Sequence, residues 1–364
     1  MMTPAPAGPV REHSDIEAIE RVPLAERGLP ESTVSMIEQA AERHPQRTAL
    51  QFFLDGRRYK RACGWRFSEL IGRIRQTANL FHELGVGPRD VVSYVLPNLP
   101  ETHFVLWGAE AVGVVNPINP LLEPDAMARL MNQAGTRVVV TLAPTPGTDI
   151  HARVRRAIEQ VPTVEHVLLV DVAAYTGALA GMALRWQARR ASGRGREYRL
   201  FRDAIDAQPA EPWLSRRAIH RDDPASLFHT GGTTGAPRIA VRTHGNEVYN
   251  AWAGSWVNGV DDSYRVLCAL PLFHAHAALI LGLMPWSLGS SVVLATPSGF
   301  RDRAVIERFR EIVDHFGINA FSAVPTVFGA LLDRNTRLAD GRVRVAFCGA
   351  APLPATVHRR FERA

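Results

Sequence analysis

The sequence predicts an α/β protein built on mostly parallel sheets. Continuous apolar runs alternate with amphipathic, helix-like segments along most of the chain, which is typical of strands connected by helices. The runs are apolar throughout rather than at every second position, which indicates strands covered on both faces. With 364 residues and a hydrophobic content of 46%, the chain is long enough for more than one core.

The alternation of predicted helices and strands begins at about residue 33. Residues 1–30 are rich in Pro, Glu and Arg without periodicity, so we expect a flexible N-terminal arm before a first helix at 33–43. The next helix carries Leu70, Ile74, Ala78 and Phe81 on one face. Further along we expect strand 91–96, helix 101–112, strand 137–141, helix 150–160 and strand 164–170.

The pattern stops near Ala173 and a basic insertion follows at about 174–212. Leu184 and Trp186 stand there beside Arg185, Arg189 and Arg190. This composition is typical of a segment that contacts a membrane surface peripherally or a partner protein. A solvated surface excursion is the alternative.

A second series of strands and helices starts at Ala225 and predicts a second sheet. A strand and a glycine-rich loop come first, and the loop is expected to enter a helix at 246–256. The later elements are strand 266–270, helix 277–288, strand 291–295, helix 303–316, strand 320–323, helix 326–333, strand 343–347 and a last helix after Pro352.

Composition limits the classes of function. The net charge of +6 comes almost entirely from arginine, since Lys60 is the only lysine, and no basic tail is present. Nucleic acid is therefore not an expected partner, whereas small anionic substrates remain compatible. Cys63, Cys268 and Cys348 are far apart, and no secretory signal is visible, so we expect a cytoplasmic protein with unpaired thiols.

The segment from Leu227 to Asn246 has the composition of a phosphate-binding loop. Its glycines let backbone amides turn inward, its threonines supply hydroxyl donors, and its arginine supplies a fixed charge. The residues expected to contact a polyphosphate are Thr230, Gly231, Gly232, Thr233, Thr234, Gly235 and Arg238. Neither the Walker pattern nor the dinucleotide fingerprint fits this stretch.

The loop resembles the phosphate-binding loop of the ANL superfamily of acyl-CoA synthetases, adenylation domains and luciferases. The family pattern runs Y/F-T-S-G-S/T-T-G-x-P-K-G, and this chain reads H-T-G-G-T-T-G-A-P-R-I. Three positions depart from the family: Gly231 replaces a serine, Arg238 a lysine and Ile239 a glycine. Arginine keeps the charge but exchanges a point ammonium for a planar fork.

Other segments resemble family motifs in the family order. Trp65 to Leu70 is similar to a helix entry, and Asp90 to Leu122 to the strand, helix and N-P turn before the loop. Leu270 to Ala277 matches the P-L-F-H motif, which implies that His274 lies by the acyl carboxylate. On residue types alone, His274 and His276 could also be zinc ligands, or His274 a core histidine.

Two later segments complete the resemblance. Phe321 to Leu332 is similar to the family segment that walls the acyl pocket, and it places Val324, Pro325 and Thr326 at a strand end. Val343 to Pro354 is similar to the stretch that passes along the adenine, where small residues allow close approach of a flat base. Those small residues are Gly349, Ala350 and Ala351.

The resemblance implies an ANL-type N-terminal domain over 31–364, with two stacked αβ subdomains. It implies an ATP-dependent carboxylic acid:CoA ligase, with Mg²⁺ entering with the nucleotide and no metal site made of protein ligands alone. The acid would be fatty or aryl. The carboxylate attacks the α-phosphate of ATP to give an acyl-adenylate and pyrophosphate, and the CoA thiolate then displaces AMP.

Several family motifs are not found in these residues. They are the Y-G-x-T-E motif, the T-G-D aspartate, and the lysine of the small C-terminal domain. We therefore expect an incomplete fold, weak nucleotide binding and negligible adenylation by this chain alone. The alternative function is a non-catalytic remnant of the fold that binds acyl groups or a partner.

Overall fold

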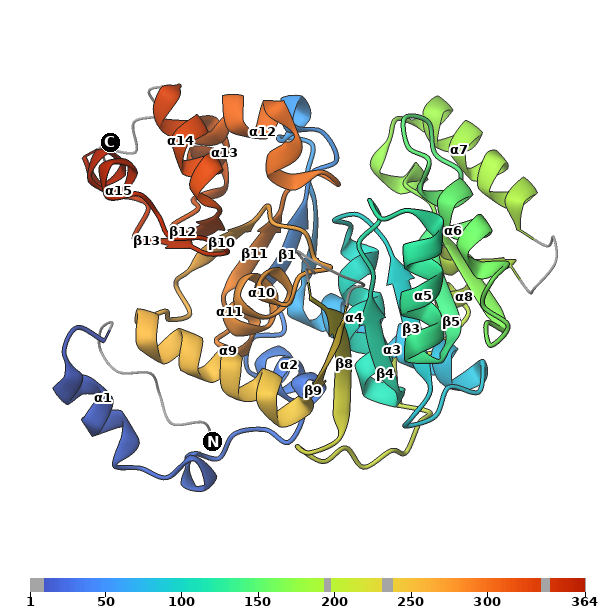
Figure 1. Cartoon of the computed structure of the whole chain (residues 1–364), viewed down its shortest axis with the longest axis horizontal. Helices are drawn as coiled ribbons and strands as arrows, with labels where there is room; N and C mark the ends of the chain where they lie inside the picture. Colours follow the sequence, from blue (N-terminus) through green and yellow to red (C-terminus); the bar gives the residue numbers. More distant parts are fainter. Residues whose placement is uncertain (1–9, 193–197, 231–237, 335–340, 364) are drawn as a thin grey trace. The chain divides into compact units, whose positions relative to one another are not determined.

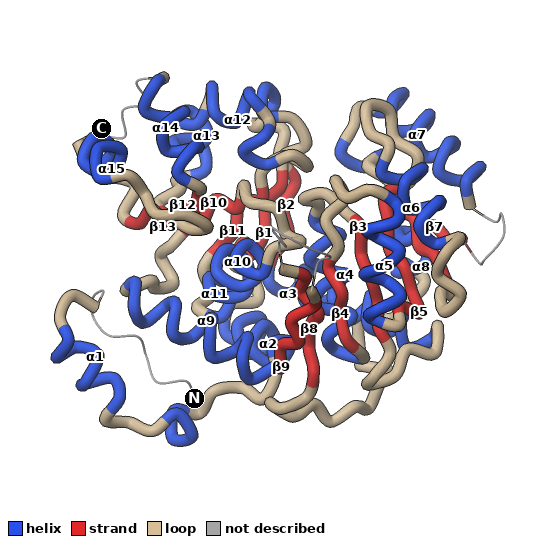
Figure 2. The backbone as a smooth tube through the Cα atoms, viewed as in Figure 1, coloured by secondary structure: helices blue, strands red, loops and turns tan. Residues whose placement is uncertain are grey.

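The computed structural model describes residues 10–192, 198–230, 238–334 and 341–363, which form two compact units (Figure 1). Unit 1 is made of the described parts of Met1–Ser68, Asn246–Pro271 and Ala275–Ala364. Unit 2 is made of the described parts of Glu69–Gly245 together with Leu272–His274. Each unit is built on its own sheet, as Figure 2 shows in red.

Unit 1 contains a six-stranded sheet in the order β13-β12-β10-β11-β1-β2. All neighbours are parallel except β2, which is antiparallel to β1. The strands are β1 (Thr48–Phe52), β2 (Cys63–Arg66), β10 (Arg265–Cys268), β11 (Ser291–Leu294), β12 (Ala320–Ala323) and β13 (Val345–Cys348). β12 is buried at every position, whereas the edge strand β13 is only partly covered.

Helices of unit 1 precede, connect and follow these strands. They are α1 (His13–Glu20), α2 (Thr33–Arg43), α9 (His244–Asn258), α10 (Ala275–Ala278), α11 (Met284–Ser287), α12 (Arg303–Glu307), α13 (Phe309–Phe316), α14 (Pro325–Asp333) and α15 (Ala355–Glu362). Shorter helical segments are η1 (Leu24–Arg27), η2 (Gly56–Arg58), η4 (Leu279–Leu283) and η5 (Gly299–Arg301). Phe309, Phe321 and Phe328 form the aromatic centre of the core, with the Phe309 and Phe321 rings 5.1 Å apart.

Unit 2 contains a seven-stranded sheet in the order β7-β6-β5-β3-β4-β8-β9. The strands are β3 (Val91–Val95), β4 (Val114–Pro117), β5 (Thr136–Leu142), β6 (His166–Val170), β7 (Tyr198–Leu200), β8 (Pro224–His229) and β9 (Ile239–Thr243). Only β9 is antiparallel to its neighbour. The helices are α3 (Phe67–Glu83), α4 (Pro100–Val112), α5 (Pro124–Ala134), α6 (Ile150–Ile158), α7 (Ala178–Ala191) and α8 (Phe201–Asp206), with η3 at Ala173–Tyr175.

The predicted α/β class with mostly parallel sheets is confirmed, and the structure differs from the expectation in local details. The expected helix 277–288 is the run α10, η4 and α11, in which η4 is a π-helix that ends two residues before Pro285. Proline has no N–H to donate, which favours an altered hydrogen-bond pattern there. The expected helix 303–316 is split into α12 and α13 at Arg308, whose ψ of 18° leaves the helical range.

Ordered elements also occur where none was expected. The arm predicted at residues 1–30 contains α1, no residue of which is buried, and η1. The basic insertion contains η3, α7, β7 and α8, and β7 extends the sheet beside β6. Throughout the described ranges, every helix is too short or too polar to traverse a lipid bilayer.

Candidate nucleotide and acyl site

The glycine-rich loop connects two antiparallel strands of unit 2. β8 and β9 pair with His229 opposite Ile239 and Phe228 opposite Ala240. The expected passage from the loop straight into a helix is therefore wrong, because Ile239 and Val241 extend the chain into a strand before α9 begins. The hairpin is closed by Thr230, whose backbone N–H donates to the Arg238 carbonyl oxygen at 2.8 Å.

Thr230 and Arg238 thus form the neck of the loop. The Thr230 hydroxyl also donates to the Arg238 carbonyl, at 3.3 Å, and both residues are exposed. The other residues predicted to contact a polyphosphate are Gly231, Gly232, Thr233, Thr234 and Gly235, and these lie outside the described residues. A hydroxyl and a guanidinium at the mouth of a loop are suitable groups for an anion.

The neck lies at the carboxyl ends of parallel strands. The backbone N–H of Asn119, just after β4, donates to Nε2 of His229 at 3.3 Å. Nε2 is therefore the unprotonated nitrogen of this ring. Burial lowers the pKa of His229, and the nearby His274 lowers it further, so His229 stays neutral near pH 7.

Two hydrogen bonds fix the P-L-F-H segment to the same edge of the sheet in unit 2. The Tyr94 hydroxyl donates to the Leu272 carbonyl at 2.7 Å, and the Leu272 N–H donates to Oδ1 of Asn98 at 3.0 Å. Tyr94 lies in β3 and Asn98 just after it. The strand motif and the P-L-F-H motif, which are far apart in the sequence, are thus brought together in the fold.

His274 is exposed to solvent at this edge, beside Phe273, and the centroids of the two rings are 4.4 Å apart. Partial desolvation lowers the pKa of His274, which leaves a neutral imidazole at pH 7. A neutral imidazole is a hydrogen-bond donor and acceptor that adds no charge. The geometry suits contact with a polar group of a ligand.

The predicted acyl-pocket residues lie at strand ends in unit 1. Val324 caps the start of α14 directly after β12, Pro325 is the first helical residue, and Thr326 is exposed. The Gly349 N–H, just after β13, donates to the Ala323 carbonyl at 3.3 Å. The acyl-pocket and adenine segments of the prediction are therefore neighbours within this unit.

Small residues follow β13 in the segment that the sequence predicts to pass along the adenine. A Cβ added to Gly349 would meet no atom within 4 Å, so open space lies beside it. Ala350 has a φ of 68°, the left-handed region that L-residues with a side chain rarely adopt. Ala350 and Ala351 are both exposed.

His276 is held by unit 1. Its Nε2 lies 2.8 Å from the Ser322 hydroxyl, which itself donates to the Phe347 carbonyl at 3.2 Å. Because the hydroxyl has one proton, Nε2–H of His276 is the donor to Ser322. In the part of the chain that the structure describes, no three His, Cys, Asp or Glu side chains are arranged to bind a metal ion. Zinc coordination by His274 and His276 is not supported.

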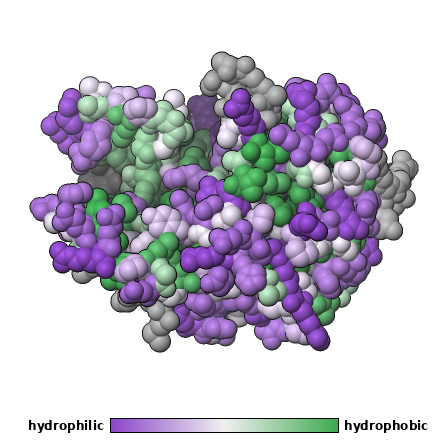
Figure 3. All heavy atoms as spheres, turned by 60° about the horizontal axis from the view of Figure 1, so that its bottom comes forward, coloured by the Kyte–Doolittle hydropathy of each residue, from purple (hydrophilic) through white to green (hydrophobic). Residues whose placement is uncertain are grey.

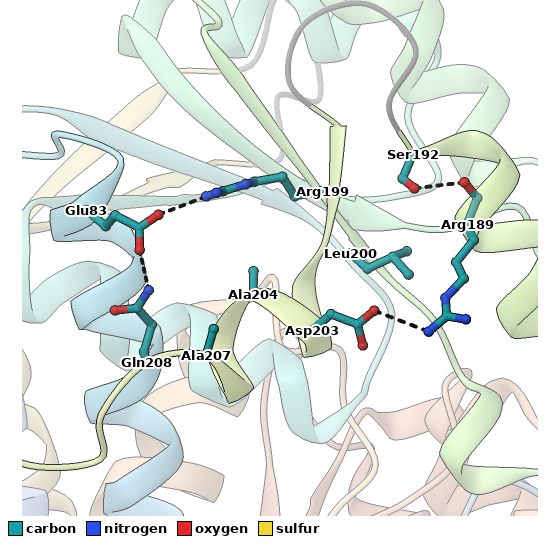
Figure 4. Close-up of a pocket in the computed structure, with 9 residues that line it drawn as sticks. All are labelled: Glu83, Arg189, Ser192, Arg199, Leu200, Asp203, Ala204, Ala207 and Gln208. Carbon is teal, nitrogen blue, oxygen red and sulfur yellow. Dashed lines mark hydrogen bonds and ion pairs between the residues drawn. The ribbon is translucent and has the colours of Figure 1, made fainter.

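A pocket of about 430 Å³ lies elsewhere in unit 2 and contains none of the predicted site residues. Figure 4 shows its charged walls, where Arg199 pairs with Glu83 at 3.1 Å and Arg189 with Asp203 at 3.8 Å. Its floor includes Leu200, Ala204 and Ala207. The charges facing this pocket are paired with one another.

Some residues of the site escape prediction from the sequence. Tyr94, Asn98, Asn119 and His229 were not expected to have roles, although His229 stands inside the loop motif and Asn119 inside the N-P turn. For Asn98 and Asn119 the available signal was a polar residue shortly after an apolar strand, since ligand sites of parallel sheets form at those ends.

These features define an α/β protein that gathers polar groups at the carboxyl ends of parallel strands. The chain belongs to the AMP-binding enzyme family, whose family model matches residues 37–364. This confirms the ANL resemblance.

Curated relatives are CoA ligases. The chain is 31% identical over 359 residues to a marinolic acid–CoA ligase of Pseudoalteromonas sp., with 97% of this chain and 52% of the relative covered. It is 31% identical over 301 residues to a feruloyl-CoA synthase of Amycolatopsis sp., covering 81% of this chain and 51% of that protein. The chain spans about half the length of these curated relatives.

Solved structures share the fold. The anthranilate CoA ligase AuaEII in complex with anthranoyl-AMP has a TM-score of 0.75 and 21% identity, with 93% of this chain and 59% of that chain covered. The N-terminal domain of FACL13 from Mycobacterium tuberculosis has a TM-score of 0.70 and 18% identity, with 92% and 73% covered. The ANL-type N-terminal fold is therefore confirmed.

Proposed function

We propose that this chain carries the ATP- and acid-binding part of an AMP-forming carboxylic acid:CoA ligase. The observation that supports it most directly is the edge of unit 2 where the neck of the loop, His229 and the P-L-F-H segment meet. The Asn119 N–H bond to His229 and the Tyr94 bond to Leu272 hold these pieces at adjacent strand ends.

In this proposal each group has a physical task. Thr230 and Arg238, with the loop that they close, bind the β- and γ-phosphates of ATP, and Mg²⁺ enters with the nucleotide. His274 and the segment Val324, Pro325 and Thr326 position the acid, and Gly349, Ala350 and Ala351 leave room for adenine. The protein accelerates the reaction by placing the carboxylate on the α-phosphate and by neutralising charge.

The substrate is a carboxylic acid of the fatty or aryl class, and CoA accepts the acyl group. The named relatives support this range, since they include a long-chain-fatty-acid–CoA ligase of Haemophilus influenzae and a feruloyl-CoA synthase. We further propose that these residues alone bind nucleotide weakly and form little adenylate. The resemblance implies a catalytic lysine, and the only lysine here is Lys60.

The test is a pair of measurements on the purified chain. Thermal shift with ATP and Mg²⁺ reports nucleotide binding, and pyrophosphate exchange with a panel of fatty and aryl acids reports adenylation. We expect a small shift with ATP and exchange close to background. Exchange comparable to that of a full-length relative would refute the proposed low activity.

The same measurements separate the alternative function, a non-catalytic remnant. A remnant that binds only acyl groups gives a shift with fatty or aryl acids and none with nucleotide. That result would reject the ATP-binding proposal for the loop.

A further inference from the structure

The helix α7 lies at the edge of unit 2 (Figure 1), and its only buried residues are the small Gly181 and Ala188. Gly181 is buried, and a Cβ added there would lie 2.8 Å from the carbonyl oxygen of Ala173 in η3. Ala188, seven residues later, has an exposed fraction of 0%. This close contact leaves no room for larger side chains on the inner face.

Three large apolar residues of α7 face solvent, and a fourth, Leu184, is half-buried. The exposed fractions are 83% for Leu179, 69% for Met182 and 60% for Trp186. Their spacing of three and four residues places them on one stripe of the helix. A helix that only covers a core has the opposite arrangement, with its largest apolar side chains inward, so this stripe calls for an apolar partner.

Arginines flank the stripe at its C-terminal end. The Arg190 guanidinium stacks over the Trp186 ring at 4.4 Å, and among the described residues it forms no ion pair with a carboxylate. Arg189 is 63% exposed and lies 3.8 Å from Asp203, whereas Arg185 turns toward Asp203 at 2.7 Å. Residues 178–191 contain three arginines and no Asp or Glu.

We propose that α7 docks on the surface of an anionic lipid bilayer. Leu179, Met182 and Trp186 enter the boundary between headgroups and acyl chains, while Arg189 and Arg190 bind lipid phosphates. An apolar stripe with arginines beside it and no carboxylates on the helix is complementary to a surface that is apolar inside and negative outside. Tryptophan is suited to that boundary because its ring is apolar with one polar N–H.

The test is co-sedimentation of the purified chain with vesicles. Binding is expected to vesicles of phosphatidylcholine mixed with phosphatidylglycerol, and to be weaker to phosphatidylcholine alone and at high salt. Replacing the stripe (Leu179→Ser, Met182→Ser and Trp186→Ser together) should lower the partition coefficient at least about tenfold. Arg190→Ala should lower it about fivefold.

Matched controls keep the result specific to α7. Leu121→Ser changes a side chain of unit 2 that is 53% exposed but outside α7, and Arg129→Ala removes an exposed arginine from α5. Both should bind vesicles like the unchanged chain. All variants alter exposed positions, so their thermal midpoints should stay within a few degrees of the unchanged chain.

Depth of insertion gives a second readout. Brominated acyl chains should quench the fluorescence of the unchanged chain on anionic vesicles, and Trp186→Phe should lose that quenching. The proposal is overturned if the unchanged chain does not bind anionic vesicles. It is also overturned if the triple variant binds as well as the unchanged chain.

Discussion

Arg238 places a fixed positive charge at the neck of the β8–β9 hairpin, where Thr230 closes the loop. If this charge binds ATP phosphates, Arg238→Ala should weaken ATP affinity by about 2 kcal/mol, roughly thirtyfold. Arg238→Lys, which restores the family residue, should keep most of the affinity. Calorimetric titration with ATP and Mg²⁺ measures both effects.

The control for Arg238 is Arg129→Ala on α5, which also removes one exposed positive charge from unit 2. It should leave ATP affinity unchanged. An equal loss of ATP affinity in Arg238→Ala and Arg129→Ala would mean that the net charge of the protein determines the affinity. That result would contradict a specific contact between Arg238 and the phosphates.

Ala350 adopts a left-handed backbone conformation, with a φ of 68°. A Cβ is unfavourable there, so Ala350→Gly should raise the free energy of unfolding by about 1 kcal/mol. Ala351→Gly, one residue further, should instead lower it by about 0.5 kcal/mol, because its φ is not positive. Chemical denaturation of the two variants checks the opposite signs.

At this scale the sequence predicts which residue types form the site but not their partners. His274 and Thr230 could be proposed because they stand inside recognisable motifs. The bond from the Asn119 N–H to His229 joins positions that are 110 residues apart in the chain. Its formation depends on the register between β4 and β8, which no local pattern specifies.

At the scale of elements, the space around a glycine shows whether its helix is closely packed at that position. A Cβ at Gly108 in α4 would lie 2.8 Å from the Cβ of Thr77 in α3, whereas at Gly329 in α14 it would meet nothing within 4 Å. Gly108→Ala should therefore destabilise the protein by about 1 to 3 kcal/mol through overpacking.

Gly329→Ala is the matched helical control, and it should stabilise by up to about 1 kcal/mol because alanine favours the helix. Thermal or urea unfolding measures both variants. Stabilisation by Gly108→Ala would show that α3 and α4 are more loosely packed than the structure has them.

Long apolar strands and amphipathic helices could be predicted from the sequence. The helix predicted at 33–43 coincides with α2, and strand 91–96 with β3 within a residue. β9 could not be predicted, because its five residues, Ile239–Thr243, show no apolar–polar alternation and follow a loop. Its pairing with β8 is a tertiary preference that outweighs weak local signals.

At the scale of the whole molecule, buried histidines connect stability to pH. Burial lowers the pKa of His103 to about 3, against 6.5 for an unburied histidine. Above pH 6.5 the imidazole of His103 is neutral in both the folded and the unfolded state, so it does not change the free energy of unfolding. As the pH falls from 6.5 toward about 3, the unfolded state alone takes up the proton, and stability falls by up to about 1.4 kcal/mol per pH unit.

His103→Gln should reduce this slope, because glutamine has no group that titrates in this range. Urea unfolding at a series of pH values from about 4 to about 7 measures how the free energy of unfolding changes with pH. Part of the slope should remain in His103→Gln, because burial also lowers the pKa of His244, to about 4. Equal slopes in the unchanged chain and in His103→Gln would mean that the imidazole of His103 is hydrated in the folded state.

The face that Figure 3 shows is mostly hydrophilic, with apolar residues gathered in smaller patches. Helix α4, by contrast, lies entirely in the interior. Every residue from Pro100 to Val112 is buried, including Glu101 and Glu110. Glu101 is held there by the Tyr175 hydroxyl at 2.7 Å and by Arg202 at 3.2 Å.

Because α4 has no solvent-exposed face, its amide hydrogens cannot exchange with water through local opening of single helical turns. The backbone of α4 should exchange with deuterium only when the whole of unit 2 opens, and so more slowly than α1 and α15, which have no buried residue. Deuterium uptake of peptides from α4, measured by mass spectrometry, would then report the free energy of opening unit 2 as a whole.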